Sequence, residues 1–197
     1  GLERAHTGDL NGAVGYYTQA IKLRLDEPET WLARARAYVS LGKYRDAIDD
    51  FDQVARLLPD KVQTYVERGY AYGEAGDYQR AADDMTRALR LQSRNPRALT
   101  LRAAAYAKLS QLPEAAADFT AAMNLSAPDT DLLLGRASVY AEMGEHQKAL
   151  EDRTAALKLS PKSAQVLISR GGSYHALGQH QQGLVPVQTQ GRQTPAP

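Results

Sequence analysis

The sequence contains no cysteine among its 197 residues. This absence excludes disulfide bonds, thiolate metal sites and catalysis by a thiol. The compartment stays unknown, because a fold built from repeats needs no disulfides in an oxidising space either. The cytoplasm is favoured, since the sequence does not open with a charged start followed by an apolar signal segment.

The sequence also has almost no excess of charge of either sign. Lys and Arg number 24 against 23 for Asp and Glu, a formal net charge of +1. Nucleic acids and anionic membranes usually require a basic face, so we expect neither as a partner. Apolar runs approaching the roughly 18 residues of a membrane-spanning helix are absent too, and we expect no membrane insertion.

A repeat of 34 residues organises what the sequence does contain. Shifting the sequence against itself by 34 aligns five tyrosines in one column: Tyr38, Tyr72, Tyr106, Tyr140 and Tyr174. The same shift aligns five arginines: Arg34, Arg68, Arg102, Arg136 and Arg170. A third column holds a glycine in four of five copies: Gly42, Gly76, Ser110, Gly144 and Gly178.

Each repeat has the pattern of a helical hairpin. With Val62 as position 1, apolar or small residues fall at positions 4, 8 and 11, and again at 20, 24, 27 and 28, which is helical spacing. Between the two runs, Gly76 suits the left-handed residue after a helix and Asp77 suits the cap of the next helix. The spacing therefore predicts two helices joined by a tight turn.

This pattern resembles the tetratricopeptide repeat, whose signature at positions 4, 7, 8, 11, 20, 24, 27 and 32 is W, L, G, Y, A, F, A and P. Residues 28–61 match it as Trp31, Ala35 in place of Gly, Tyr38, Ala47, Phe51, Val54 in place of Ala, and Pro59, with Arg34 in place of Leu. The resemblance extends from about Gly8 to Gly178. It implies an all-α, right-handed superhelical solenoid of antiparallel helix hairpins.

The repeat register divides the sequence into segments. Residues 1–27 are a partial repeat that supplies a second helix, with an apolar stripe at Ala13, Tyr17, Ala20 and Leu23. Full repeats follow at 28–61, 62–95, 96–129 and 130–163. Residues 164–180 are the first helix of a degenerate repeat, and 181–197, rich in Gln, Pro, Gly and Thr, are expected to be disordered. Because Gly1 stands at position 8, we interpret the sequence as a fragment or a processed product.

Position 7 is arginine in every copy, and position 23 is aspartate in the four full repeats. Two antiparallel helices folded about position 15 bring these positions face to face. We therefore predict ion pairs within the hairpins: Arg34 with Asp50, Arg68 with Asp84, Arg102 with Asp118, and Arg136 with Asp152. An anion-binding stripe of arginines is the alternative, and it is disfavoured because the acid recurs in step with the base.

The sequence shows no constellation typical of catalysis. Histidine is the side chain best suited to bind metal or transfer protons, but His146 and His180 occupy position 17, where Tyr44 and Tyr78 stand in other copies, so we expect them to pack as aromatic residues. The HExxH, GxxxxGK[ST] and GxSxG motifs are absent. We predict no enzymatic activity, no cofactor and no metal.

The resemblance implies a concave groove lined by first-helix positions 2, 5, 6, 9, 12 and 13. The candidate groove residues are Arg36, Val39, Ser40, Val66, Glu67, Tyr70, Glu74, Arg97, Ala104, Lys108, Asp131, Ser138 and Glu142. Acidic groups outnumber basic ones over these positions, which favours a client of mixed or mildly basic character. An acidic chaperone C-terminal tail is disfavoured, because only Arg97 keeps the required charge and Glu67 would repel a carboxylate.

Taken together, these features indicate a scaffold for protein–protein interaction that binds a peptide segment or a protein surface in its groove. Two alternatives stay open. One is a self-assembly or structural element of a larger multidomain protein, and the other is a non-catalytic fragment of an enzyme that carries a repeat region. We expect a monomer or weak self-association.

Overall fold

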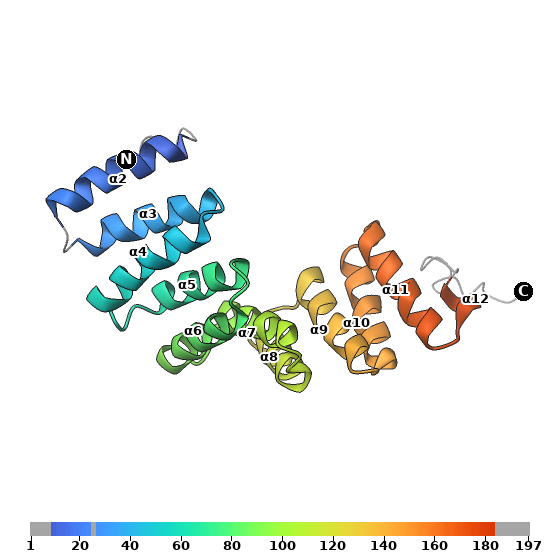
Figure 1. The fold of residues 1–197 in the computed structure, drawn as a ribbon. Coiled ribbons are helices and arrows are strands. Elements are labelled where there is room, and N and C mark those ends of the chain that lie inside the picture. Colours follow the sequence, from blue (N-terminus) through green and yellow to red (C-terminus); the bar gives the residue numbers. More distant parts are fainter. Residues whose placement is uncertain (1–8, 25–26, 184–197) are drawn as a thin grey trace, which may run out of the picture. The chain divides into compact units, whose positions relative to one another are not determined.

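The computed structural model describes residues 9–24 and 27–183, and their regular structure is helical throughout (Figure 1). No strand occurs in these two ranges, which agrees with the predicted all-α repeat solenoid. The helices in chain order are α2 (Leu10–Leu23), α3 (Pro28–Ser40), α4 (Tyr44–Leu57), α5 (Val62–Glu74), α6 (Tyr78–Leu91), α7 (Pro96–Lys108), α8 (Leu112–Leu125), α9 (Thr130–Glu142), α10 (His146–Leu159), α11 (Ala164–Ala176) and α12 (His180–Gly183).

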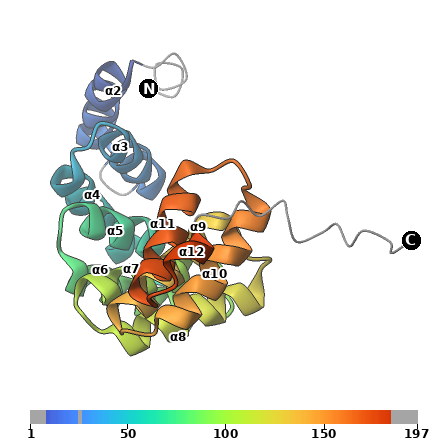
Figure 2. The ribbon, with the colours of Figure 1, turned by 90° about the vertical axis from the view of Figure 1, so that its right-hand side faces the viewer.

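The helices belong to two compact units, one that ends at Ser126 and one that begins at Ala127. In the first unit, α2 packs on α3, and the hairpins α3–α4, α5–α6 and α7–α8 stack in order. Helices α2 to α6 follow one another in the same order in both views (Figure 1, Figure 2). The second unit contains the hairpin α9–α10, with α11 packed on α10 and α12 after it.

Tight turns join the two helices of each hairpin. After α3, the amide of Lys43 donates to the carbonyl of Tyr38 over 2.9 Å, a bond that closes the end of the helix around a left-handed residue. That residue is Gly42, with φ at 70°. Ser110 takes the same place after α7 with φ at 59°, so this hairpin alone among those described makes the turn with a β-carbon present.

The predicted ion pairs within the hairpins are confirmed. Arg68 donates from Nε and Nη2 to both carboxylate oxygens of Asp84, over 2.7 and 2.6 Å. The same two-pronged contact joins the other three pairs: Arg34 with Asp50, Arg102 with Asp118, and Arg136 with Asp152. Planar two-pronged pairing is the strongest geometry available to an arginine and a carboxylate.

The third nitrogen of these arginines makes a contact that the sequence analysis did not foresee. In Arg68, Nη1 donates to Asp52, 16 residues earlier, over 2.7 Å. Arg34 reaches Thr18 in the same way over 2.9 Å, and Arg102 reaches Thr86 over 3.2 Å. Each of these residues lies on the second helix of the preceding repeat. One guanidinium therefore ties together its own hairpin and the preceding second helix.

Burial sets the electrostatics of these pairs. The hydrogen bonds that Arg68 donates to Asp84 raise the pKa of Arg68 against the opposing effect of burial. Burial raises the pKa of Asp84, and the hydrogen bonds and charge of Arg68 oppose that rise. The cost of removing Asp84 from water is thus offset only while Arg68 stays in place.

The N-terminal stripe differs from its prediction. Ala13 and Tyr17 are buried against α3, as expected, and Ile21 joins them. Ala20 and Leu23 are exposed, with Leu23 at 85%. The reason is that α3 covers one face of α2, while a first helix covering the other face is not among the described residues.

The segment predicted to be disordered lies mostly outside the described residues. Residues 181–183 complete the short helix α12, and residues 184–197 are not described.

A glycine on α5 permits a close approach of α6. A β-carbon on Gly69 would lie 2.4 Å from Met85 Cε, 3.0 Å from Asp84 Cβ and 3.2 Å from the Ala81 carbonyl oxygen. Gly73, one turn later, has only Ala81 Cβ nearby, at 3.9 Å from such an atom. The two glycines of α5 are therefore expected to respond oppositely to substitution.

We expect Gly69→Ala to lower the free energy of unfolding by about 1–3 kcal/mol, because the methyl group overpacks the contact with α6. Gly73→Ala should raise it by about 0.5–1 kcal/mol through helix propensity. Urea denaturation followed by circular dichroism measures both values. Equal effects of the two substitutions would contradict the assigned approach of α5 to α6.

A double-mutant cycle on Arg102→Met and Asp118→Leu should show a coupling energy above roughly 1 kcal/mol, the upper end for exposed pairs. The two side chains are 20% and 11% exposed, so removal of one partner leaves the other charge buried. The matched control is Arg87 with Asp60, a pair 45% and 83% exposed. If the cycle on Arg102 and Asp118 gives no more coupling energy than this control, the ion pairs within the hairpins are not shielded from solvent.

Candidate functional site

Two neighbouring pockets lie over the first helices of the first unit, and Tyr70 lines both. We call them the apolar pocket, beside Gly73, and the charged pocket, beside Glu67. Tyr70 is half-buried on α5, between the two.

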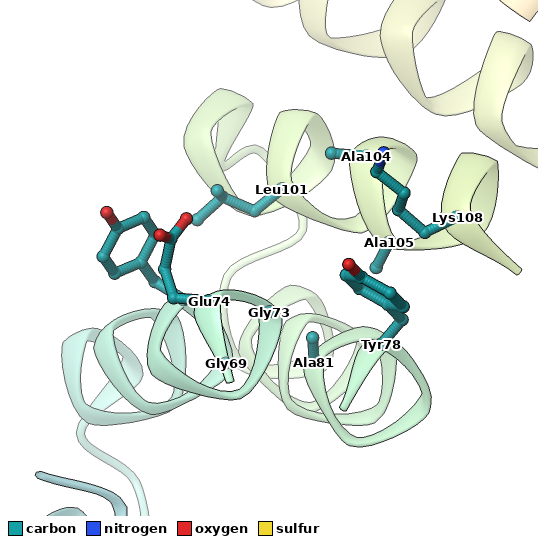
Figure 3. Close-up of a pocket in the computed structure, with 10 residues that line it drawn as sticks. Gly69, Gly73, Glu74, Tyr78, Ala81, Leu101, Ala104, Ala105 and Lys108 are labelled. Carbon is teal, nitrogen blue, oxygen red and sulfur yellow. The ribbon is translucent and has the colours of Figure 1, made fainter. Parts of the chain in front are cut away.

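The apolar pocket has a volume of about 230 Å³ and lies between α5, the start of α6, and α7 (Figure 3). Figure 3 shows Glu74 and Leu101 towards one side of it, and Tyr78 and Lys108 towards the other. The space between them exists because small residues stand on the facing helices: Gly69, Gly73, Ala81, Ala104 and Ala105. An apolar floor with charged groups at its rim suits an inserted aliphatic or aromatic side chain.

The charged pocket is of similar size, about 260 Å³, and carries an organised ion pair. Arg36 on α3 donates from Nε and Nη2 to the two carboxylate oxygens of Glu67 on α5, over 2.8 and 2.7 Å. Gln63 donates to the same carboxylate over 2.7 Å. Arg97, on α7, lines the pocket as well. Three successive first helices therefore contribute charge to one depression.

These contacts change the role expected of Glu67. Burial raises its pKa, but the hydrogen bonds from Arg36 and Gln63 and the charges of Arg36 and Arg97 outweigh burial, so the net shift of the pKa is downward. The carboxylate is ionised at neutral pH and its charge is matched by Arg36. The repulsion expected between Glu67 and the carboxylate of a client is therefore reduced by the charge of Arg36.

Most groove residues predicted for the first unit line these pockets. The charged pocket contains Arg36, Val39, Ser40, Glu67, Tyr70 and Arg97, and the apolar pocket contains Tyr70, Glu74, Ala104 and Lys108. Val66 is the exception, because it is 1% exposed and packs in the core with Tyr65, Met85, Ala88 and Ala98. Val66 therefore offers no surface to a partner. In this repeat, position 5 packs with the second helix and with the start of the next repeat.

Three predicted groove residues belong to the second unit. Asp131, Ser138 and Glu142 are exposed on α9. Ser138 donates its hydroxyl to the carbonyl of Leu134 over 3.0 Å, which uses its hydrogen within its own helix. These residues line none of the pockets described for the first unit.

Residues from second helices also line the pockets, although the repeat positions used for the groove did not include them. Tyr78, at position 17, forms a wall of the apolar pocket. The equivalent residue of the preceding repeat, Tyr44, donates its hydroxyl to Glu74 over 3.3 Å. The tyrosines at position 17 could have indicated this contact, because the first turn of a second helix lies beside the end of the first helix of the same hairpin.

Two of the described histidines, on α11 and α12, lie next to each other. His175 and His180 contact each other with their Nδ1 atoms 3.3 Å apart and their ring centroids 5.0 Å apart, and both are exposed, so His180 packs against an aromatic ring at the surface and not in the core. Within residues 9–24 and 27–183, no group of three or more His, Asp or Glu side chains is placed to hold a metal ion. In the same ranges, no helix is both long enough and apolar enough to cross a membrane.

Comparison with known proteins agrees with this architecture. Three tetratricopeptide repeat models match the sequence, over residues 28–61, 66–129 and 130–163. No curated protein sequence matches the chain.

Solved structures show the same fold. A crystal structure of MamA is 21% identical, with a TM-score of 0.77 over 83% of this chain and 95% of its own. MamA from Desulfovibrio magneticus RS-1 is 20% identical, with a TM-score of 0.78 over 83% and 92%. YrrB, described as a protein of this repeat type with an unusual peptide-binding site, is 21% identical, with a TM-score of 0.71 over 85% and 87%. At this identity the likeness concerns the fold alone.

The pair of Arg36 and Glu67 makes stability depend on pH. Because the folded-state pKa of Glu67 lies below its ordinary value, the pair stabilises the fold above that value and loses the contribution as the pH falls through the folded-state pKa. We expect Glu67→Gln to lower the free energy of unfolding by about 0.5–1 kcal/mol at pH 7. The difference from the unchanged chain should shrink as the pH falls towards 3. A difference that stays constant over this range would show that the charge of Glu67 contributes nothing.

Proposed function

Because the chain belongs to the tetratricopeptide repeat family, we propose that it is a non-catalytic interaction scaffold that binds a peptide segment across the apolar and charged pockets of its first unit. The observation that carries the proposal is the pair of adjoining pockets that share Tyr70. A peptide that crosses Tyr70 contacts both pockets at once.

The apolar pocket supplies the affinity. Its volume of about 230 Å³ suits one or two side chains and not a whole small-molecule ligand, since such ligands usually occupy about 300 Å³ or more. Full burial of one Leu, Ile, Phe or Met side chain stabilises a complex by about 1.5–3 kcal/mol. An apolar residue of the client therefore anchors the peptide beside Gly73.

The charged pocket and the rim supply the selectivity. Arg36, Arg97 and Lys108 stand against Glu67 and Glu74, so the lining of the two pockets carries three positive and two negative charges. We infer a client of mixed charge. The mildly basic preference expected from the sequence depended in part on Glu67, whose charge is already compensated by Arg36.

The test begins with a displayed library of random peptides, selected on the 197-residue chain. Gly73→Leu should weaken binding of the selected peptides about tenfold or more, because the added side chain occupies the space that an apolar residue of about 1.5–3 kcal/mol would fill. The substitution raises helix propensity, and a β-carbon at this position meets only Ala81 Cβ, at 3.9 Å, so we expect the fold to be retained. Fluorescence anisotropy with a labelled selected peptide measures the affinity.

Gly15→Leu is the matched control, because Gly15 is exposed on α2 and a β-carbon there meets nothing within 4 Å. Its affinity should equal that of the unchanged chain. If the selected peptides bind Gly73→Leu normally and lose affinity for Arg80→Glu with Arg87→Glu on the outer helix α6, the site lies on the other face.

A further inference from the structure

The rim of the apolar pocket carries two opposite charges at the same position of successive repeats. Glu74 is the last residue of α5, and Lys108 is the last residue of α7. Both side chains line the pocket, and Figure 3 shows them on opposite sides of it. The pocket is therefore negative at one rim and positive at the other.

Neither of these two charges is matched by the chain itself. Both side chains are exposed, and among the described residues neither of them forms an ion pair. The carboxylate of Glu74 accepts a hydrogen bond from a neutral group, the hydroxyl of Tyr44 on α4, over 3.3 Å. In the charged pocket, by contrast, both oxygens of Glu67 are held by Arg36. The negative charge that stays available to a client is that of Glu74.

The pocket between the two rims admits one apolar side chain of a bound segment. In an extended segment, alternate side chains face the same surface and lie about 6.5–7 Å apart. When an apolar residue enters beside Gly73, the residues two positions before and after it face the two rims. A basic residue at the Glu74 rim and an acidic residue at the Lys108 rim complement the charges found there.

We propose that the client is an extended segment in which a basic and an acidic residue stand two positions to either side of the apolar anchor. This inference rests on the peptide binding proposed above and adds the charge pattern of the peptide. A segment with the same charge on both sides would place a like charge against one rim, so repulsion as well as attraction selects the client. Tyr44 is a positioning residue, because its hydroxyl holds the carboxylate of Glu74.

The test uses peptides selected from the displayed random library on the unchanged 197-residue chain, with affinities measured by fluorescence anisotropy. Glu74→Lys should weaken binding of a selected peptide about tenfold, because one attraction is lost and one repulsion of similar size is gained. Changing the basic residue of the peptide to Glu should restore binding to this variant. Lys108→Glu should weaken binding to a similar extent, and changing the acidic residue of the peptide to Lys should restore it.

Two control variants change the net charge by the same amounts away from the pockets. Glu114→Lys on α8 and Lys158→Glu on α10 alter exposed residues that line neither pocket. Their affinities should equal that of the unchanged chain. Glu74→Gln keeps the shape of the side chain and should weaken binding about threefold, since it removes the attraction without adding a repulsion. Circular dichroism checks that every variant is folded.

Two outcomes overturn the charge pattern. One is restored binding to Lys108→Glu when the basic residue of the peptide is changed to Glu, because the rims would then be assigned the wrong way round. The other is a set of peptides that lose affinity for Gly73→Leu but bind Glu74→Lys and Lys108→Glu as tightly as the control variants. In that case the proposed peptide binding stands. Selected peptides that bind Gly73→Leu normally overturn the proposed function itself, so the two failures are distinct.

Discussion

The guanidinium at position 7 is the contact on which the stacking of the first unit depends. Arg68 uses two nitrogens to hold Asp84 across its own hairpin and a third to hold Asp52 on the preceding second helix. A leucine at this position, as in the family signature, could pack but could not make three directed bonds. The arginine replaces part of the apolar contact between helices with directed hydrogen bonds. These bonds form in only one relative orientation of the neighbouring helices.

The same contacts reduce the demand on the rest of the first helix. Because Arg68 and Asp84 hold α5 to α6 together with the close approach at Gly69, Gly73 is not needed to fix the hairpin. A small residue at Gly73 opens the apolar pocket, which Gly69 also lines. The helix contact at Gly69 and the pocket space at Gly73 therefore lie one turn apart on the same side of α5.

Much of the architecture was predictable because its determinants are local and repeated. The 34-residue period places the hairpins, and the antiparallel geometry of two helices pairs Arg102 with Asp118. The burial of Val66 was not predictable from its position alone, since it depends on the neighbours Met85 and Ala98 from two other helices. The contact between Arg36 and Glu67 spans 31 residues and depends on how far two side chains reach between consecutive first helices.

The residues that accept from the third nitrogen of these arginines share one position of the repeat. Thr18, Asp52 and Thr86 share position 25, but a polar residue on a helix has many possible roles, so the column alone does not identify a partner. Exposure at Ala20 could not be inferred from apolar spacing either. A stripe shows which residues can be buried, and only the packed neighbours decide which of them are.

One turn of α5 carries nearly every task of the first unit in consecutive residues. Val66 fills the core, Glu67 holds Arg36, Arg68 joins the hairpins, Gly69 admits α6, and Tyr70 divides the pockets. Substitutions in this segment are therefore expected to lower the stability of the fold. Under the proposed function, the side chains that line the apolar pocket on other positions, Gly73, Leu101, Ala104 and Lys108, can change the preference for a client at less cost to the packing beneath them.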